Sequence, residues 1–332
     1  MLVCMTGGTG FLGAHTVAAA VRAGHRVRLL VRDESAVEPA LAPFGVDVDV
    51  VVGDVTDPFA VTRAVRGADA VVHMAALYSF DSRDRANMQR VNEGGTAVVL
   101  ETARRHAGSI VHVSSIFALD VEHDRVLRAD SPVARAKEPY LASKAAAEVI
   151  AREHQEAGAP VVITYPSALI GPHDSRLGDQ NARLRNVLRG LMPIWPTGGF
   201  PVGDVRDTAT LHARLLDPVP GNRYFGPGRY LSTRDFVRTL RAITGRRLPA
   251  VFLPATSMLP VGLLVGLVQR VWPWHIPAEY GAIYTCSRRV RVDENADTNG
   301  VKARPVEETV RDTVSWMRDA GWLTARQSVA VA

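Results

Sequence analysis

The sequence predicts an α/β fold in which a doubly wound parallel sheet carries helices on both faces. Three observations lead to this fold class. The first half alternates short runs of valine, leucine and isoleucine with amphipathic stretches of helical length, the pattern of strands joined by crossover helices. A glycine-rich turn connects the first run to the first helical stretch. After Tyr165 the alternation gives way to proline- and glycine-punctuated segments, which predict a smaller C-terminal region.

The expected elements follow the chain in order. Helices are predicted where apolar residues recur at helical spacing, and strands where a short apolar run is bounded by turn residues. The last helix opens with two glutamates, which suit the positive end of a helix dipole. The strands are expected at 2–5, 27–30, 48–52, 70–73, 110–113 and 161–165, and the helices at 13–23, 59–65, 94–105, 141–157, 180–189, 233–244 and 306–319.

The composition is that of an ordinary globular chain, with 47% hydrophobic and 22% charged residues in 332. Its arginines are scattered, without a basic block or interleaved aromatics, so the net charge of +5 does not predict nucleic-acid binding. Cys4 and Cys286, the two cysteines, lie far apart, and the ten histidines show no metal-ligand spacing. We therefore expect no metal site and a cytoplasmic location. The strand expected from residue 2 leaves no room for a signal peptide.

The longest apolar stretch is MLPVGLLVGLV at 258–268. Pro260, Gly262 and Gly266 interrupt it and it is too short to span a bilayer, so no transmembrane segment is expected. A buried or partner-facing helix is the simpler interpretation, and a membrane anchor that lies on the surface is the alternative.

The turn after the first strand reads TGGTGFLG at 6–13 and leads into a helix. Gly7, Gly10 and Gly13 permit a tight turn, let backbone N–H groups approach a pyrophosphate, and allow the helix to pack against the sheet. The strand, the helix and a later strand all stand where this fingerprint needs them. The turn therefore predicts dinucleotide binding and a sheet of the Rossmann type.

The end of the second strand usually decides between NAD and NADP. Val31 stands there in place of an acid and Arg32 follows it, which favours NADP(H) over NAD(H) because a guanidinium group suits a 2′-phosphate. The alternative is that Arg32 is a surface residue and Asp33 turns in to bind the ribose. Asp54, after the third strand, either accepts a hydrogen bond from the adenine amino group or caps a turn.

A serine, a tyrosine and a lysine are the candidate catalytic residues. Ser115 ends the fifth strand, and Tyr140 and Lys144 begin the helix that follows. At this spacing the tyrosine and lysine share a helical face, so we expect the ammonium group to lower the phenol pKa. Ser115 is placed to hydrogen-bond the substrate oxygen. A core tyrosine beside a surface lysine is the simpler alternative, but only three of the 39 basic residues are lysines. The pattern predicts acid–base catalysis by Tyr140.

Taken together, these motifs resemble those of the extended short-chain dehydrogenase/reductases in the NAD-dependent epimerase/dehydratase family, nearest to the dihydroflavonol-reductase-like branch. They occur in the family order over most of the first two thirds of the chain, and RPVEETVRDTVSWM at 304–317 resembles the closing helix. The others are TGGTGFLG at 6–13, GDV at 53–55, HMAA at 73–76, VNEGGT at 91–96, VSS at 113–115, YLASK at 140–144, YPSALIGPHD at 165–174 and DVRD at 204–207.

The resemblance implies a set of cofactor contacts. It also implies that Asn92 is a structural or proton-relay residue before the serine strand. Tyr165 departs from the family, in which an arginine commonly precedes the proline, and Met74 replaces a small or polar residue. The implied contacts are Gly7, Gly10, Phe11, Leu12 and Gly13 with the pyrophosphate, Asp54 and Val55 beside the adenine, Ala75 and Ala76 under the nicotinamide ribose, Tyr140 and Lys144 on its hydroxyls, and Pro166 and Ser167 at the carboxamide.

These features predict an NAD(P)(H)-dependent oxidoreductase that reduces a carbonyl of a small hydrophobic molecule or oxidises the alcohol. An NAD-dependent nucleotide-sugar epimerase or dehydratase is the first alternative. Arg32 argues mildly against it, and Glu138 is the only acid close to Tyr140 in the sequence. A non-catalytic NADP-sensing protein is the second alternative.

The smaller region is expected to bind the substrate. We expect a dinucleotide-binding domain at 1–167 and a substrate-binding region at 168–332, of which about 204–217 and 304–320 pack back on the first. Helices at 94–105 and 141–157 could pair two subunits in a homodimer. The substrate contacts are expected from Ser115, from Tyr78 and Phe80 just beyond the fourth strand, and from His173, with Arg176, Asn181 and Trp195 as further candidates.

Overall fold

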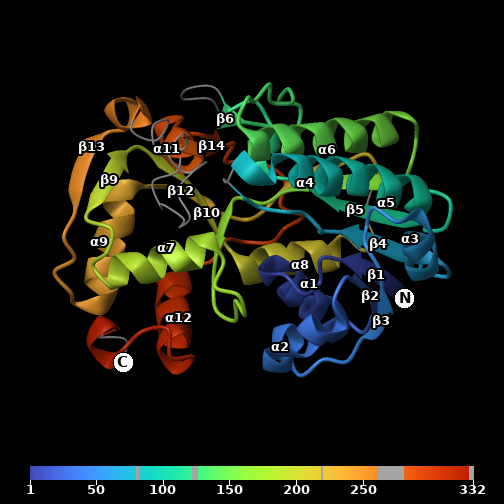
Figure 1. The fold of residues 1–332 in the computed structure, drawn as a ribbon, viewed down its shortest axis with the longest axis horizontal. Coiled ribbons are helices and arrows are strands. Elements are labelled where there is room, and N and C mark those ends of the chain that lie inside the picture. The colour runs from blue at the N-terminus through green and yellow to red at the C-terminus, as the bar shows by residue number, and fades with distance from the viewer. Residues whose placement is uncertain (80–81, 122–125, 218–219, 261–279, 329–332) are drawn as a thin grey trace.

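The computed structural model describes residues 1–79, 82–121, 126–217, 220–260 and 280–328 (Figure 1). Within these residues, the main sheet has seven strands, all parallel, in the order β11-β7-β5-β4-β1-β2-β3. The chain builds one side of the sheet from β1 to β3 and then the other from β4 outward. This is the doubly wound arrangement, so the predicted fold class is confirmed.

Six of the seven strands lie where the sequence predicts them. The seventh, β11 (Arg223–Phe225), comes from the second half of the chain and pairs with β7. It extends the main sheet beyond the boundary expected at residue 167, and its three residues are too few to show a periodic pattern. The six predicted strands are β1 (Leu2–Thr6), β2 (Arg26–Val31), β3 (Asp49–Val52), β4 (Ala70–His73), β5 (Ser109–Val113) and β7 (Val161–Tyr165).

Helices cover both faces of this sheet (Figure 1). Val17 and Leu211 belong to the core under one face, and Val61 and Val99 to the core under the other. These side chains recur at helical spacing on the inner side of each helix, which is why the apolar stripes predicted the helices. The first face carries α1 (Phe11–Arg22), α2 (Val37–Leu41) and α8 (Val205–Arg214), and the second α3 (Pro58–Val65), α4 (Arg85–Met88), α5 (Gly95–Ala103) and α6 (Pro139–Glu156).

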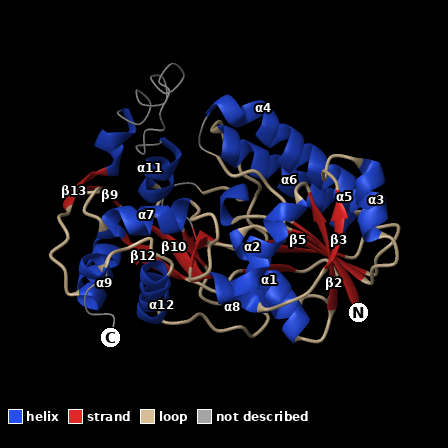
Figure 2. Cartoon of the chain, turned by 60° about the horizontal axis from the view of Figure 1, so that its bottom comes forward, coloured by secondary structure: helices blue, strands red, loops and turns tan. Residues whose placement is uncertain are grey.

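A smaller layer lies at the opposite end of the molecule from the N-terminus (Figures 1 and 2). Its core contains Trp195, so this candidate substrate residue is a packing residue. The layer consists of a sheet of β8 (Ala168–Ile170), β10 (Gly199–Asp204) and β12 (Arg229–Ser232), the pair β9 (Ile194–Thr197) with β13 (Val251–Pro254), and the helices α7 (Asp179–Leu188), α9 (Thr233–Thr244), α11 (Tyr280–Ser287) and α12 (Val306–Asp319). The remaining pair, β6 (Val126–Leu127) with β14 (Arg291–Val292), packs Leu127 and Val292 on the core of the main sheet.

The two segments expected to pack back on the first domain behave differently. Helix α8 packs against α1, and His212 hydrogen-bonds Thr16 of α1 at 3.2 Å and Thr164 of β7 at 3.1 Å. Helix α12 instead places its apolar face in the smaller core. Polar contacts also join it to the start of α8, such as Thr309 to Asp204 at 2.8 Å, so the expectation for 304–320 stays a prediction.

The apolar stretch at 258–268 lies mostly outside the described residues. Residues 258–260 are helical, and nothing beyond them in this stretch is described. Among the helices of the described residues, none combines the length and apolarity needed to cross a membrane.

Candidate active site

Two neighbouring cavities open at the carboxyl ends of the parallel strands. The smaller has a volume of about 190 Å³ and is lined by the glycine turn after β1 and the ends of β2, β3 and β4. The larger, of about 360 Å³, is lined by the residues that follow β5 and β7. Met74 lines both cavities, so they adjoin at the end of β4. This is the edge of the sheet at which doubly wound folds bind nucleotides.

The three glycines of the turn differ in what makes them necessary. Gly7 has φ 75°, and a Cβ there would lie 2.7 Å from the backbone nitrogen of Ala75. A Cβ on Gly13 would collide with the carbonyl oxygen of Gly7, so this glycine lets α1 pack against the turn. Gly10 has a milder conflict, 3.3 Å from the same oxygen, and lines the smaller cavity. Because Gly10 has no side chain, its backbone is open to that cavity.

The N-terminus of α1 completes an anion site beside this turn. No side chain of the described residues caps Gly10, and the first turn carries no acid. Phe11 and Leu12 follow and line the larger cavity. A helix end with free N–H groups facing a cavity fits the pyrophosphate of a dinucleotide. Ala75, Ala76 and Val55 line the smaller cavity, as the resemblance implies.

The alternatives left open above for Arg32, Asp33 and Asp54 concern the part of the smaller cavity beside the ends of β2 and β3. Arg32 lines the cavity. Asp33 does not, because its carboxylate accepts hydrogen bonds from the backbone N–H of Ser35 at 3.0 Å and its hydroxyl at 2.6 Å. Asp54 caps its turn by accepting from Thr56 and also lines the cavity, so both roles considered for it are compatible. Arg176, a further candidate for substrate contact, lines this cavity and not the larger one.

Ser115, Tyr140 and Lys144 all line the larger cavity. Tyr140 lies in the first turn of α6, which Glu138 caps by accepting from the backbone N–H of Tyr140 at 3.2 Å and of Leu141 at 2.8 Å. Ser115 caps the 3-10 turn after β5 and hydrogen-bonds the Tyr140 side chain. The spacing in the sequence and the strand order therefore bring the three groups together.

The phenol and the ammonium group are both strongly affected by burial. Burial, followed by the charges of Glu138 and Asp179, raises the pKa of Tyr140 above its ordinary range, and the hydrogen bond with Ser115 opposes this. The expected lowering of this pKa by the lysine charge together with an oxidised nicotinamide stays a prediction, because it concerns the protein with its cofactor bound. Burial also lowers the pKa of Lys144 to about 8, and its ammonium donates to the carbonyl oxygen of Val113 at 3.3 Å.

Asn92 supports the loop that passes over Tyr140. Its side chain accepts from Leu77 N–H at 2.7 Å and donates to Leu77 C=O and to Ser143 Oγ, both at 2.9 Å. Ser143 in turn donates to the Tyr140 carbonyl oxygen at 2.8 Å. Asn92 lies in a π-helical turn, Gln89–Gly94, a feature often found at functional sites. These contacts support the structural role implied for Asn92.

Two buried hydroxyl groups in the larger cavity test whether a ligand fits there. Ser114 Oγ and Ser167 Oγ have no hydrogen-bond partner among the described residues, and both serines line the cavity with Pro166. A buried polar group normally has a partner, so these hydroxyls fit polar groups of a bound molecule. Ser167 is the residue implied to contact the carboxamide.

Of the residues expected to contact the substrate, some line the larger cavity and others do not. Tyr78 lines the larger cavity and meets the Tyr140 ring edge-on, with centroids 4.6 Å apart. His173 lines neither cavity and packs against Phe44, with centroids 5.5 Å apart, so the structure does not support a substrate role for it. Asn181 lines the larger cavity, but its amide donates to Gly171 C=O and Asp174. Phe80 lies outside the described residues.

Sequence reasoning missed several residues of this cavity. Asp174 and Asp179 come from the loop before α7 and its first turn, and both line it. Phe117, Leu169 and Phe200 make the lining mainly apolar. Both acids are distant from Tyr140 in the sequence, but in the fold the charge of Asp179 raises the pKa of Tyr140, so Glu138 is not the only acid near the phenol.

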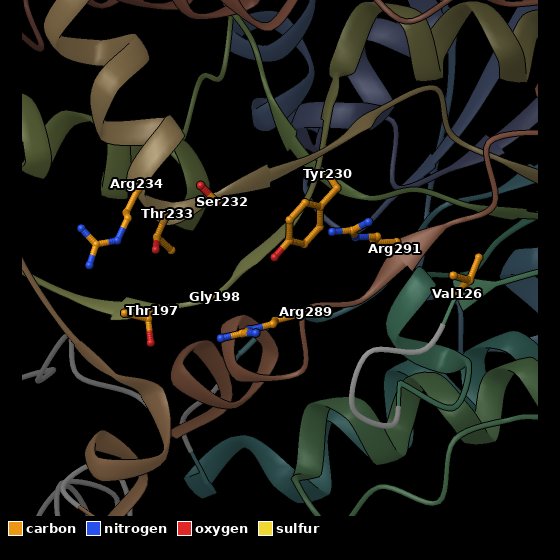
Figure 3. Close-up of a pocket in the computed structure, with 9 residues that line it drawn as sticks. All are labelled: Val126, Thr197, Gly198, Tyr230, Ser232, Thr233, Arg234, Arg289 and Arg291. Atoms are coloured by element: carbon orange, nitrogen blue, oxygen red, sulfur yellow. The ribbon is translucent and has the colours of Figure 1, made fainter.

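A third cavity, of about 690 Å³, shares none of its described lining residues with the cavity of the triad. Most of its lining comes from the smaller layer (Figure 3). Arg234, Arg289 and Arg291 line it, and Figure 3 shows them around the same space as Tyr230. None of the described residues that line it is acidic. A cavity with several guanidinium groups suits an anion such as a phosphate.

Comparisons with known proteins agree with this geometry. A sequence profile of the NAD dependent epimerase/dehydratase family matches residues 3–224. Sterol demethylase protein B of Methylococcus capsulatus is 28% identical over 97% of this chain and 100% of its own. A Synechocystis protein with the provisional name dihydroflavonol 4-reductase is 33% identical over 96% of this chain and 95% of its own. The crystal structure of gox2253 superposes with a TM-score of 0.79 at 26% identity, covering 97% of this chain and 99% of that one.

Proposed function

The chain belongs to the NAD dependent epimerase/dehydratase family, and from that premise we propose that it reduces a carbonyl of a small hydrophobic molecule, or oxidises the alcohol, with NAD(P)(H). One observation carries the proposal. Ser115, Tyr140 and Lys144 line a mainly apolar cavity that adjoins the nucleotide cavity at Met74. An acid–base group thus stands where a nicotinamide and a carbonyl can meet.

The residues of the larger cavity perform the proton transfer. A nicotinamide cofactor held by the smaller cavity would supply or accept a hydride at the carbonyl carbon. Tyr140 is a neutral phenol because burial raises its pKa, so in the reductive direction it donates its proton to the carbonyl oxygen. Ser115 hydrogen-bonds that oxygen and holds it toward the phenol. Lys144, one helical turn further along α6, has a pKa near neutrality and can return a proton to Tyr140.

The lining of the larger cavity supports a hydrophobic substrate. Phe117, Leu169 and Phe200 come from three different segments and present apolar surface beside the triad. Tyr78 adds an aromatic face next to Tyr140. One relative is named for a sterol, which agrees with a largely apolar ligand. We therefore favour aromatic, steroidal or long-chain carbonyls over small polar ones.

We propose NADP(H) as the preferred cofactor. Arg32 lines the adenosine end of the smaller cavity, where a guanidinium group can pair with a 2′-phosphate. Asp33, the acid that would hold a free ribose, instead has its carboxylate engaged by Ser35. We also propose a cytoplasmic location, because Cys4 and Cys286 are buried free thiols, as is usual in a reducing compartment.

The direct test is turnover by the purified protein. NADPH or NADH is supplied with a panel of aromatic, steroidal and aliphatic carbonyls, and cofactor oxidation is followed. Tyr140→Phe removes the proton donor and should lower kcat by about a hundredfold or more. Tyr224→Phe, a buried tyrosine outside both cavities, is the matched control. Tight cofactor binding without consumption on any carbonyl would reject the reductase and favour an epimerase or a non-catalytic NADP-sensing protein.

One observation favours a second candidate, a nucleotide-sugar epimerase or dehydratase. Asp179 lines the larger cavity with Tyr140 and its charge raises the pKa of that tyrosine, so it supplies a second acid near Tyr140. Arg183 lines the same cavity, where its guanidinium group can pair with the diphosphate of such a substrate. Thermal stabilisation by UDP-glucose or dTDP-glucose that Arg183→Ala abolishes would support this candidate. Absence of any stabilisation by either sugar nucleotide would remove it.

A further inference from the structure

The loop between β8 and α7 reaches both cavities. Asp174 and Gly178 of this loop line the larger cavity. Arg176, between them, lines the smaller one together with Arg32 and Asp54. A short segment from the second half of the chain therefore places a cation at the adenosine end of the nucleotide cavity.

The charge of Arg176 also acts on the residues that follow β2. Two hydrogen bonds from Ser35 hold the pKa of Asp33 below its usual range, and the charge of Arg176 contributes to the same effect. Asp33 directly follows Arg32. Arg176 and Arg32 thus reach the same end of the cavity from segments far apart in the sequence.

The loop holds an unfavourable backbone shape. His173 has φ 59° and Leu177 has φ 46°. Both values lie in the left-handed region of backbone conformation, which residues other than glycine rarely adopt. Surrounding contacts maintain this shape. Asp174 accepts from the backbone N–H of Gly178 at 2.8 Å and from Asn181 at 3.0 Å, and His15 Nε2 lies 2.9 Å from Pro172 C=O. Strain that is maintained by so many contacts is typical of segments that position a functional group.

We propose that Arg176 is a second cation, with Arg32, of a site that binds the 2′-phosphate of NADP(H). This inference rests on the cofactor preference proposed above and adds a residue that the end of β2 does not supply. Two guanidinium groups can share the phosphate oxygens, which carry about two negative charges and accept charge-assisted hydrogen bonds. The charged residues that line the cavity are two arginines, Arg32 and Arg176, and one acid, Asp54. The lining therefore has a net positive charge, which favours binding of this anion.

Binding of nucleotide fragments isolates this role from catalysis. Isothermal titration calorimetry with 2′,5′-ADP measures the affinity for a fragment that carries the 2′-phosphate. The same titration with 5′-AMP measures the affinity for a fragment that lacks it. Arg176→Met should weaken 2′,5′-ADP by about tenfold to a hundredfold and leave 5′-AMP unchanged, because only the first ligand meets the guanidinium. Arg32→Met should show the same selectivity. Arg189→Met, an exposed arginine at the end of α7, is the matched control and should change neither ligand.

The outcomes separate this inference from the proposed function. If the unmodified protein prefers 2′,5′-ADP and Arg176→Met retains that preference, the NADP(H) preference stands and Arg176 is not part of the site. Equal weakening of both ligands would assign Arg176 a structural role in the loop and would also overturn the proposal. If the unmodified protein binds the two fragments equally, the NADP(H) preference fails and the Arg176 site fails with it.

Discussion

The hydroxyl group of Tyr165 donates a 2.6 Å hydrogen bond to Oε1 of Glu148, a fully buried carboxylate on α6. The Nε atom of Arg152, one turn further along the helix, donates to the same oxygen at 2.7 Å. Tyr165, the residue that departs from the family pattern, is therefore a neutral donor in a group of three polar side chains that also contains the guanidinium group of Arg152.

Loss of Arg152 should therefore be costly. Arg152→Met leaves Glu148 buried without its cation and should lower the free energy of unfolding by about 3–5 kcal/mol. Tyr165→Phe removes one neutral donor and should cost about 1–3 kcal/mol. Urea unfolding of both variants measures the two losses in the free energy of unfolding and shows which is larger. A loss below about 1 kcal/mol for Arg152→Met would mean that the pair behaves like an exposed surface pair.

Activity should fall in mildly alkaline solution. The pKa of Lys144 is lowered to about 8, so its ammonium group is lost above that pH while the Tyr140 phenol is still protonated. If the ammonium returns the proton, kcat declines with an apparent pKa near 8. Lys144→Arg keeps its charge at all these pH values, so its lower activity should not show this decline. An unchanged alkaline decline in Lys144→Arg would assign it to another group.

The same lysine should make the stability of the protein depend on pH, in the opposite direction to activity. Its pKa is 10.5 in the unfolded chain and about 8 in the fold, so between these values the unfolded state binds more protons. Stability then rises with pH across this window, by at most about 3 kcal/mol from this group. Lys144→Met should unfold with a weaker pH dependence in this range. An equal dependence in both proteins would show that Lys144 is not the group responsible.

Asn92 should matter for turnover more than for binding. Asn92→Ala breaks the contacts that hold Leu77 and Ser143 beside Tyr140, so the phenol loses its fixed position. We expect kcat to fall by about tenfold to a hundredfold, with a smaller change in affinity for 2′,5′-ADP. Ser143→Ala, which keeps the Leu77 bonds, should have a milder effect. Normal kcat in Asn92→Ala would reduce its role to folding.

Acid should destabilise the fold through its buried histidines. Burial lowers the pKa of both His73 and His212 to about 3, against 6.5 in the unfolded chain. The unfolded state therefore binds more protons between these values, and stability is lost as pH falls through them, by about 2 kcal/mol per histidine at pH 5. His212→Gln keeps a polar group between Thr16 and Thr164 but does not titrate, so its unfolding free energy should fall less steeply in acid. An equally steep fall would contradict the assignment.

The part of the site that depends on local spacing could be predicted from the sequence. Gly7 and Gly10 stand in a short turn between a strand and a helix, and Tyr140 and Lys144 are one helical turn apart, so their placement follows from local geometry. The direction of the Tyr140 pKa could not be predicted in this way. It depends on how deeply α6 is buried and on Asp179, which a different region of the chain supplies.

The sequence by itself determined the order of strands and helices, the glycine turn and the positions of the serine, tyrosine and lysine, because each is set by residues a few positions apart. Only the tertiary structure decided that β11 completes the main sheet, that His173 and Trp195 pack away from the active-site cavity, and that Arg176 reaches the nucleotide end. These depend on contacts between distant segments. No local pattern records such contacts, since they follow from how whole faces of the helices and sheets are buried against each other.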